Sequence, residues 1–70
     1  MIDTLRTAHP SWAWSQDGDT YTGRRGLAIL TVTHDVVWRA QWSLGPFATV
    51  GLHETPAQAV SRALWNAGQA

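Results

Sequence analysis

Three histidines have the widest chemical repertoire among the residues of this chain. His9, His34 and His53, with Asp35 or Glu54 as a fourth ligand, could in principle form a zinc site, because neutral imidazole is a favoured ligand of that ion. No two of these histidines have the i, i+3 or i, i+4 spacing that places ligands on one face of a helix, and all three fall at the expected ends of elements. The sequence therefore predicts no metal ion and no other cofactor.

Catalytic and nucleotide-binding motifs are absent from the sequence. It contains serine, histidine and aspartate, but no nucleophile elbow, no H-E-x-x-H helix and no P-loop. Asp17-Gly18-Asp19 lacks the further oxygen ligands and the closing glutamate of a calcium loop, so we interpret it as a solvated hairpin tip. Seventy residues also leave little volume for a pocket beside a core. We expect that the protein is not an enzyme.

All five basic side chains are arginines, and five carboxylates balance them. A module that holds nucleic acid through its phosphates normally carries a basic excess, and a DNA mimic is strongly acidic, so the balance favours neither class. Arg24 and Arg25, between Gly23 and Gly26, are expected in a flexible, positively charged loop or bulge. With Arg39 they could form a modest basic surface for phosphates or for an acidic protein patch; the alternative is that all three are simply solvated.

Five tryptophans offer a different kind of chemistry, the burial or docking of large aromatic rings. Trp38 and Trp42 share one face of an expected strand, with the small Ala40 between them, and are predicted to fill the core. Trp12 and Trp14 share one face of an expected edge hairpin. They are also predicted to be core, with an exposed aromatic patch as the alternative.

Trp65 differs from the other four tryptophans, because it lies roughly opposite the apolar stripe of the last expected helix. Its neighbours on that side are Arg62, Ser61 and Gln58. An exposed tryptophan beside an arginine is typical of binding hot spots, so Trp65 is a candidate anchor for a partner and Arg62 its nearest polar contact. The alternative is that the ring folds over the edge of the core or against the N-terminal segment.

The elements that position these side chains follow from helix, strand and turn signals. A short helix over residues 2–8 should end at His9-Pro10, because the residue before a proline avoids the α region. Asp17-Gly18 predicts a hairpin, with Tyr21 returning on the partner strand. The β-branched run from Leu27 to Thr33 predicts a central strand, followed by a turn.

Strict alternation of apolar and polar residues over residues 36–44 predicts the clearest strand of the chain. One of its faces would carry Val36, Trp38, Ala40, Trp42 and Leu44. Gly45-Pro46 then turns the chain, and residues 47–53 continue as a strand. The apolar residues of that strand, Ala48, Val50 and Leu52, are predicted to face the core.

The last element is a helix with signals at both ends. Thr55 is the expected N-cap, Pro56 the first helical residue, Gln58 the partner of Thr55 in a capping box, and Gly68 the residue that ends the helix. Its predicted apolar stripe consists of Val60, Ala63, Leu64 and Ala67, extended by Pro56 and Ala57.

These elements predict an α+β fold: an antiparallel sheet of three to five strands, with a short N-terminal helix and one C-terminal helix packed on one face. With 44% hydrophobic residues the chain is too apolar to be disordered, and residues 1–70 are expected to form a single compact domain. No apolar run reaches the roughly 18 residues of a membrane span, and no signal peptide heads the chain. The lack of cysteine fits a cytoplasmic location.

The order of short helix, antiparallel strands and C-terminal helix is similar to that of a double-stranded-RNA-binding domain, over most of the chain. That resemblance implies contacts to RNA at the start of the last helix, where the family places a cluster of lysines. The matching positions here are Thr55, Pro56, Ala57 and Gln58, none of which is basic. We therefore expect no direct binding of nucleic acid.

In its size, its lack of cysteine and its lack of a catalytic motif, the chain resembles small phage-encoded inhibitors of bacterial defence, anti-CRISPR proteins among them. The resemblance is one of type, without a shared motif. It implies a protein that acts by docking onto a protein or nucleoprotein complex in the cytoplasm of a host cell. Two alternatives stay open: a nucleic-acid-binding or regulatory module that uses the arginines, and a homodimeric subunit whose tryptophans form the interface.

Overall fold

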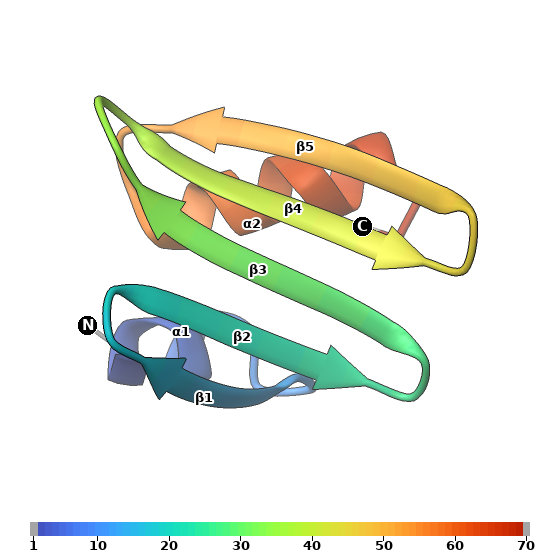
Figure 1. Ribbon diagram of the computed structural model, residues 1–70, viewed down its shortest axis with the longest axis horizontal. Coiled ribbons are helices and arrows are strands. Elements are labelled where there is room, and N and C mark those ends of the chain that lie inside the picture. Colours follow the sequence, from blue (N-terminus) through green and yellow to red (C-terminus); the bar gives the residue numbers. More distant parts are fainter. Residues whose placement is uncertain (1, 70) are drawn as a thin grey trace.

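A computed structural model describes residues 2–69 and shows one sheet with the helices behind it (Figure 1). The elements in chain order are α1 (Ile2–Ala8), β1 (Ala13–Asp17), β2 (Thr20–Arg25), β3 (Ala28–His34), β4 (Trp38–Leu44), β5 (Phe47–His53) and α2 (Pro56–Asn66). The five strands are antiparallel and lie in chain order, so β1 and β5 are the edge strands. The predicted α+β fold, with a short N-terminal helix and a C-terminal helix packed on the sheet, is confirmed.

Two-residue turns that begin with glycine connect β1 to β2, β2 to β3 and β4 to β5. Gly18, Gly26 and Gly45 have φ angles of 59°, 60° and 57°, a left-handed conformation that glycine adopts without a steric penalty. Each turn places the residues that flank it directly opposite one another. The flanking pairs are Asp17–Thr20, Arg25–Ala28 and Leu44–Phe47. The turns thereby set the register, and with it the face on which every side chain lies.

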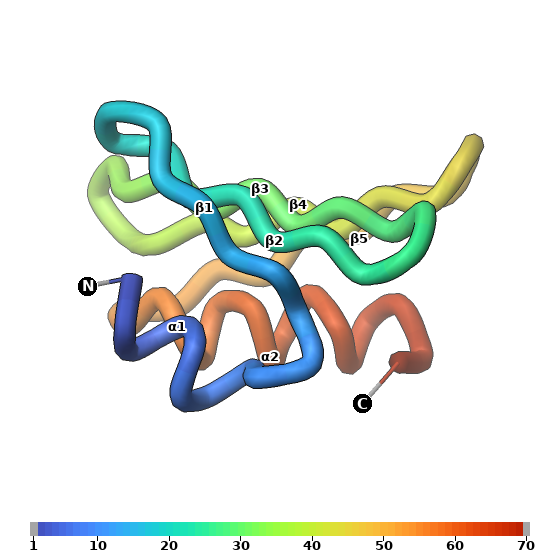
Figure 2. The backbone as a smooth tube through the Cα atoms, turned by 90° about the horizontal axis from the view of Figure 1, so that it is seen from below, coloured from blue at the N-terminus to red at the C-terminus, as the bar shows by residue number. Residues whose placement is uncertain are grey.

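Both helices lie on one face of the sheet, as the edge-on view shows (Figure 2). Helix α2 packs against β4 and β5, and α1 lies beside β1. The core fills the space between the helices and this inner face of the sheet. The opposite face, which we call the open face, has no helix of residues 2–69 over it.

The core is built mainly from the tryptophans and from aliphatic side chains. Trp12, Trp14 and Trp42 are buried, which confirms their predicted role. Trp38 is only half-buried and packs against the edge of the core. Among residues 2–69, the indole N–H of Trp42 has no acceptor within hydrogen-bond distance. The aliphatic and small core residues are Leu5, Ala28, Leu30, Val32, Ala40, Ala59, Val60, Ala63 and Leu64.

The predicted orientation of β5 is wrong. Ala40 and Trp42 face the core from β4, and their partners across the ladder are Gly51 and Thr49. Residues directly opposite in a sheet share a face, so Thr49 and Gly51 point inward. The apolar residues between and beside them, Ala48, Val50 and Leu52, therefore lie on the open face. The two-residue turn at Gly45-Pro46 decides this register against the hydrophobic pattern.

Two boundaries also differ from the prediction. Arg24 and Arg25 are not in a loop but form the end of β2, because the turn is made by Gly26 and Leu27. Strand β4 begins at Trp38, and Val36, predicted on its inner face, is 91% exposed in the turn that follows β3. In both places the limit of the strand is set by the residues that pair with the neighbouring strand, and not by the apolar pattern. Strand β2 thus continues to Arg25, and β4 begins two residues after Val36.

The ends of α2 agree with the prediction except for one hydrogen bond. Thr55 is the N-cap, and its Oγ1 accepts a hydrogen bond from the amide of Gln58 at 3.4 Å. The amide of Thr55 donates to Nδ1 of His53 at 3.4 Å rather than to the Gln58 side chain, so only half of the expected capping box forms. At the other end, Gly68 has a φ angle of 73°, and the amide of Gln69 donates to the carbonyl of Leu64 at 2.8 Å.

Candidate functional site

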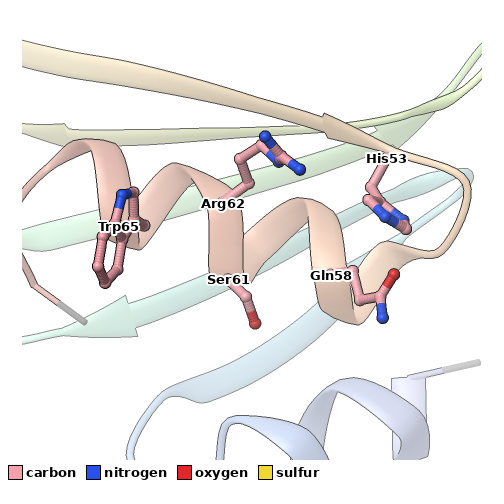
Figure 3. Close-up of a pocket in the computed structure, with 5 residues that line it drawn as sticks. All are labelled: His53, Gln58, Ser61, Arg62 and Trp65. Atoms are coloured by element: carbon pink, nitrogen blue, oxygen red, sulfur yellow. The ribbon is translucent and has the colours of Figure 1, made fainter.

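The position of α2 on the sheet depends on the small residues where the helix crosses β5. Gly51 faces the helix, and a Cβ atom at this position would overlap the carbonyl oxygen of Ala59 and the amide nitrogen of Ala63. Thr49 adds a hydrogen bond from its Oγ1 to the carbonyl of Ala63 at 2.7 Å. The backbone of α2 thus lies directly on an edge strand. Arg62, on the side of α2 next to β5, therefore lies at the rim of the sheet (Figure 3).

A shallow groove of about 530 Å³ follows the outward side of α2. It is lined by residues of the helix and by one residue from the end of β5, and we call it the α2 groove: His53, Gln58, Ser61, Arg62 and Trp65 (Figure 3). Trp65 is 73% exposed. The alternative interpretation, in which this ring folds over the core or against the N-terminal segment, is therefore wrong.

The polar side chains of the α2 groove point in different directions (Figure 3). The guanidinium of Arg62 extends away from the Trp65 ring, toward His53 at the end of β5. Ser61 points to the other side of the helix, where its Oγ donates to the carbonyl of Ala57 at 3.0 Å and lies 3.4 Å from Nε2 of His9. The groove therefore has an aromatic end at Trp65 and a polar end between Arg62 and His53.

Hydrogen-bond donors predominate at the polar end of the α2 groove. The Nδ1 atom of His53 accepts from the amide of Thr55, so the neutral ring carries its proton on Nε2 and can donate it. Arg62 adds guanidinium donors, and Gln58 adds an amide. None of the five lining residues is acidic. The groove is thus suited to a partner surface with an apolar side chain for Trp65 and a carboxylate for Arg62.

The other three predicted partner-binding residues do not form one basic surface. Arg24 and Arg39 both lie on the open face, where Arg24 is opposite Ile29 and Arg39 is opposite Thr33. They are two strands and four residues apart, which corresponds to roughly 16 Å between their Cα atoms. Arg25 lies on the other face of the sheet.

Arg25 contacts three residues that the sequence analysis did not connect with it. Its guanidinium carbon lies 4.6 Å from the centre of the Trp12 ring. Its nitrogen atoms also lie 3.3 Å from Oγ of Ser11 and 3.4 Å from Oε1 of Gln69. The cation–π contact covers one side of the buried Trp12 ring. The two hydrogen bonds link the end of β2 to the segment before β1 and to the segment after α2.

The open face carries an apolar strip that sequence reasoning placed in the core. Val50 and Leu52 lie on β5 opposite Gln41 and Arg39, and Leu52 is 53% exposed. The carbonyl of Val50 at the edge of the sheet accepts a hydrogen bond from Nδ2 of Asn66 at 3.0 Å. A side chain from α2 thus occupies part of the free edge of β5, where another strand would otherwise pair.

The three histidines have separate roles. Nε2 of His9 lies 3.0 Å from the carbonyl of Ala57 and links the segment after α1 to α2, while His34 stacks on Trp38 with ring centres 4.3 Å apart. Within residues 2–69, no three His, Asp or Glu side chains are placed to hold a metal ion together. In the same range, no helix is both long enough and apolar enough to cross a membrane.

No protein-family model, no curated protein and no solved structure matches this chain.

Proposed function

We propose that this protein is a non-catalytic module that acts by docking onto a partner protein through the α2 groove. The observation that supports this proposal is the exposure of Trp65, which leaves 73% of the residue in solvent beside Arg62. A tryptophan buries roughly 150–250 Å², so covering the exposed part at ~25 cal/mol per Å² would contribute about 3–4.5 kcal/mol before the costs of association. That is the range of a hot-spot residue.

The charges around the α2 groove define the partner surface further. Arg62 and His53 supply donors at one end of the groove, and no carboxylate lines it. The complementary surface carries an apolar side chain opposite Trp65 and, toward the His53 end of the groove, an exposed aspartate or glutamate opposite Arg62. We therefore propose an acidic protein surface, rather than a nucleic acid, as the occupant.

The class of partner follows from the resemblance in size and composition to small phage-encoded inhibitors of bacterial defence. Such a protein would act by covering a surface that a defence complex needs, which requires no catalytic residue and no cofactor. This part of the proposal depends only on the similarity in size and composition, because no sequence motif is shared. The docking surface itself depends on Trp65 and Arg62 and can be tested without it.

Trp65→Ala is the direct test of the proposal. The immobilised protein should capture a specific partner from a bacterial lysate, and the affinity for that partner, measured by calorimetry, should fall by at least about 2 kcal/mol in the variant, or roughly 30-fold. The melting temperature should change little, because the ring is outside the core. A variant that melts far below the parent protein would contradict the exposed placement of the ring.

Matched controls separate the α2 groove from the rest of the surface. Leu27→Ala truncates another exposed apolar side chain, in the β2–β3 turn, and should bind the partner as the parent does. Arg62→Glu should weaken binding, whereas Arg24→Glu, the same reversal on the open face, should not. Equal capture by Trp65→Ala, Arg62→Glu and the parent would refute the α2 groove as the docking surface. A self-associating protein whose dimer is lost in Trp65→Ala would favour the homodimer instead.

A further inference from the structure

A second concave site lies on the inner face of the sheet, at the end where the β1–β2 and β3–β4 turns meet. It is a pocket of about 300 Å³ lined by Asp19, Tyr21, His34 and Trp38. Asp19 comes from the β1–β2 turn, and the other three come from β2, the end of β3 and the start of β4. None of these residues belongs to the α2 groove, so the pocket is a separate feature of the molecule.

Three of the four lining residues of this pocket carry aromatic rings. The rings of Tyr21 and Trp38 are tilted by 53°, with their centres 6.3 Å apart. The imidazole of His34 stacks on Trp38, with 4.3 Å between the centres and 10° between the planes. The three rings thus form one contiguous aromatic wall, and the ring faces that stay open to the pocket present π-electron density to whatever enters it. This arrangement attracts cations more strongly than neutral groups.

The charges near the pocket have the same preference. Of its four lining residues, Asp19 alone carries a formal charge, and Asp35 belongs to the β3–β4 turn at the same end of the sheet. The arginines are occupied or directed elsewhere. Arg6 pairs with Asp3 on α1, and Arg25 lies over Trp12. Arg24 and Arg39 lie on the open face, and Arg62 lies in the α2 groove. The formal charge that lines the pocket is therefore negative, and it would attract a bound cation.

A bare metal ion does not fit these walls. Within residues 2–69 no three His, Asp or Glu side chains are placed to ligate one ion, and the pocket lining offers only one carboxylate and one imidazole. A cation whose charge is surrounded by alkyl groups needs little hydration and can contact the rings directly. A volume of about 300 Å³ is at the lower end for ligand pockets and suits such a head group.

We propose that this pocket binds an organic cation of the alkylated ammonium class, with Trp38 and Tyr21 against its alkyl groups and Asp19 as its counter-ion. The ligand could be a free quaternary ammonium compound or the methylated lysine side chain of another protein, since both present the same head group. This inference goes beyond docking through the α2 groove and does not depend on it.

Choline and its neutral isostere 3,3-dimethylbutan-1-ol test the proposal, because they share a shape and differ in charge. The indole N–H resonance of Trp38, assigned with Trp38→Phe, should shift as choline is added, with a dissociation constant in the millimolar range. The neutral alcohol should bind about 5- to 30-fold more weakly, which corresponds to the strength of a cation–π contact. Equal binding of the two compounds, or no shift of Trp38 up to about 50 mM choline, would overturn the proposal.

Asp19→Asn and Asp35→Asn form a matched pair of variants. Both remove one negative charge from an exposed turn at the same end of the sheet, but only Asp19 lines the pocket. Asp19→Asn should weaken choline binding by at least about threefold and leave the binding of the alcohol unchanged, whereas Asp35→Asn should change neither. An equal loss of choline affinity in both variants would mean that choline is attracted only by the overall negative charge at this end of the sheet. That result would refute the pocket as a specific site.

The source of the ligand is distinguished with peptides. A short peptide that contains trimethyllysine is compared with choline and with the same peptide carrying unmodified lysine. Tighter binding of the methylated peptide than of choline supports a protein side chain as the ligand, and equal or weaker binding supports a free ammonium compound. Preference for unmodified lysine over both would overturn the assignment to an alkylated cation, because a small hydrated ammonium would then be the better fit.

Discussion

Gly51→Ala is expected to be the most damaging single-methyl change in this protein. The Cβ atom that it adds would overlap the carbonyl oxygen of Ala59 and the amide nitrogen of Ala63, and would lie 3.0 Å from the carbonyl carbon of Arg62. All three are backbone atoms inside a helix, and none of them can rotate away. The helix would have to move off β5 as a whole, which would also lengthen the 2.7 Å hydrogen bond from Thr49 to Ala63.

The magnitude follows from the size of the protein and the nature of the contact. Overpacking a core commonly costs about 1–3 kcal/mol, and a clash with rigid backbone belongs at the upper end of that range or beyond it. A chain of 70 residues has a total stability of about 3.5–10 kcal/mol. A loss of about 3 kcal/mol should therefore lower the melting temperature by roughly 12–24 °C. Thermal denaturation followed by circular dichroism measures it.

Two comparison variants show whether the cause is the contact with α2. Ala48→Val adds carbon atoms to the same strand on the open face and should change stability by no more than about 0.5 kcal/mol. In Gly23→Ala the new Cβ would lie 2.9 Å from Cζ3 of Trp14, a side chain that can shift, so its cost should be smaller than that of Gly51→Ala. A Gly51→Ala variant within about 1 kcal/mol of the parent would refute the close seating of α2 on β5.

Two further predictions concern the core and the arginines. Trp42→Ala should destabilise the protein by about 3–5 kcal/mol, as truncation of a buried aromatic residue does, and a melting temperature within about two degrees of the parent would contradict the register of β4. Duplex DNA and duplex RNA should show no appreciable binding in gel-shift assays near physiological salt. Micromolar binding that Arg24→Ala and Arg25→Ala abolish would instead favour a nucleic-acid-binding module.

The sequence was sufficient to predict the elements because each carries its own local signal. Gly18 and Gly45 mark two of the hairpins, Thr55 and Gly68 mark the ends of α2, and alternation marks β4. The third hairpin turn, at Gly26 and Leu27, was missed, because Leu27 was assigned to the strand that follows. Each of these signals acts within a few residues, so no knowledge of distant contacts is needed to interpret it. The exposed position of Trp65, opposite the helix stripe, follows from the same local periodicity.

The orientation of β5 shows where such reasoning fails. Val50 and Leu52 are apolar, so the pattern places them in the core, yet the two-residue turn at Gly45-Pro46 puts Gly51 opposite the buried Ala40. Turn length was visible in the sequence and could have corrected the prediction. The need for glycine at the crossing with α2 could not have been seen, because it depends on how closely the helix backbone approaches the strand.

The separation of the arginines has a similar cause. Arg24 and Arg25 are adjacent in a strand, so their side chains point to opposite faces of the sheet. The predicted shared basic surface required both side chains to point the same way, which a loop would have allowed. The pocket at Asp19, Tyr21, His34 and Trp38 was also invisible, since its four residues come from separate elements and meet only through the register of β2, β3 and β4. Sequence patterns within one element do not contain that information.

Gly51 and Trp65 together provide a way to separate folding from docking in a molecule this small. The close contact at Gly51 stabilises the fold, and it also holds α2 at the rim of β5, where the α2 groove forms. Gly51→Ala should therefore reduce stability and partner binding together. Trp65→Ala removes an exposed ring and should reduce binding alone. If both variants lost binding only in proportion to their loss of stability, Trp65 would have no role apart from the fold. The search for the docking surface would then move to the open face, where Val50, Leu52 and Arg39 lie side by side.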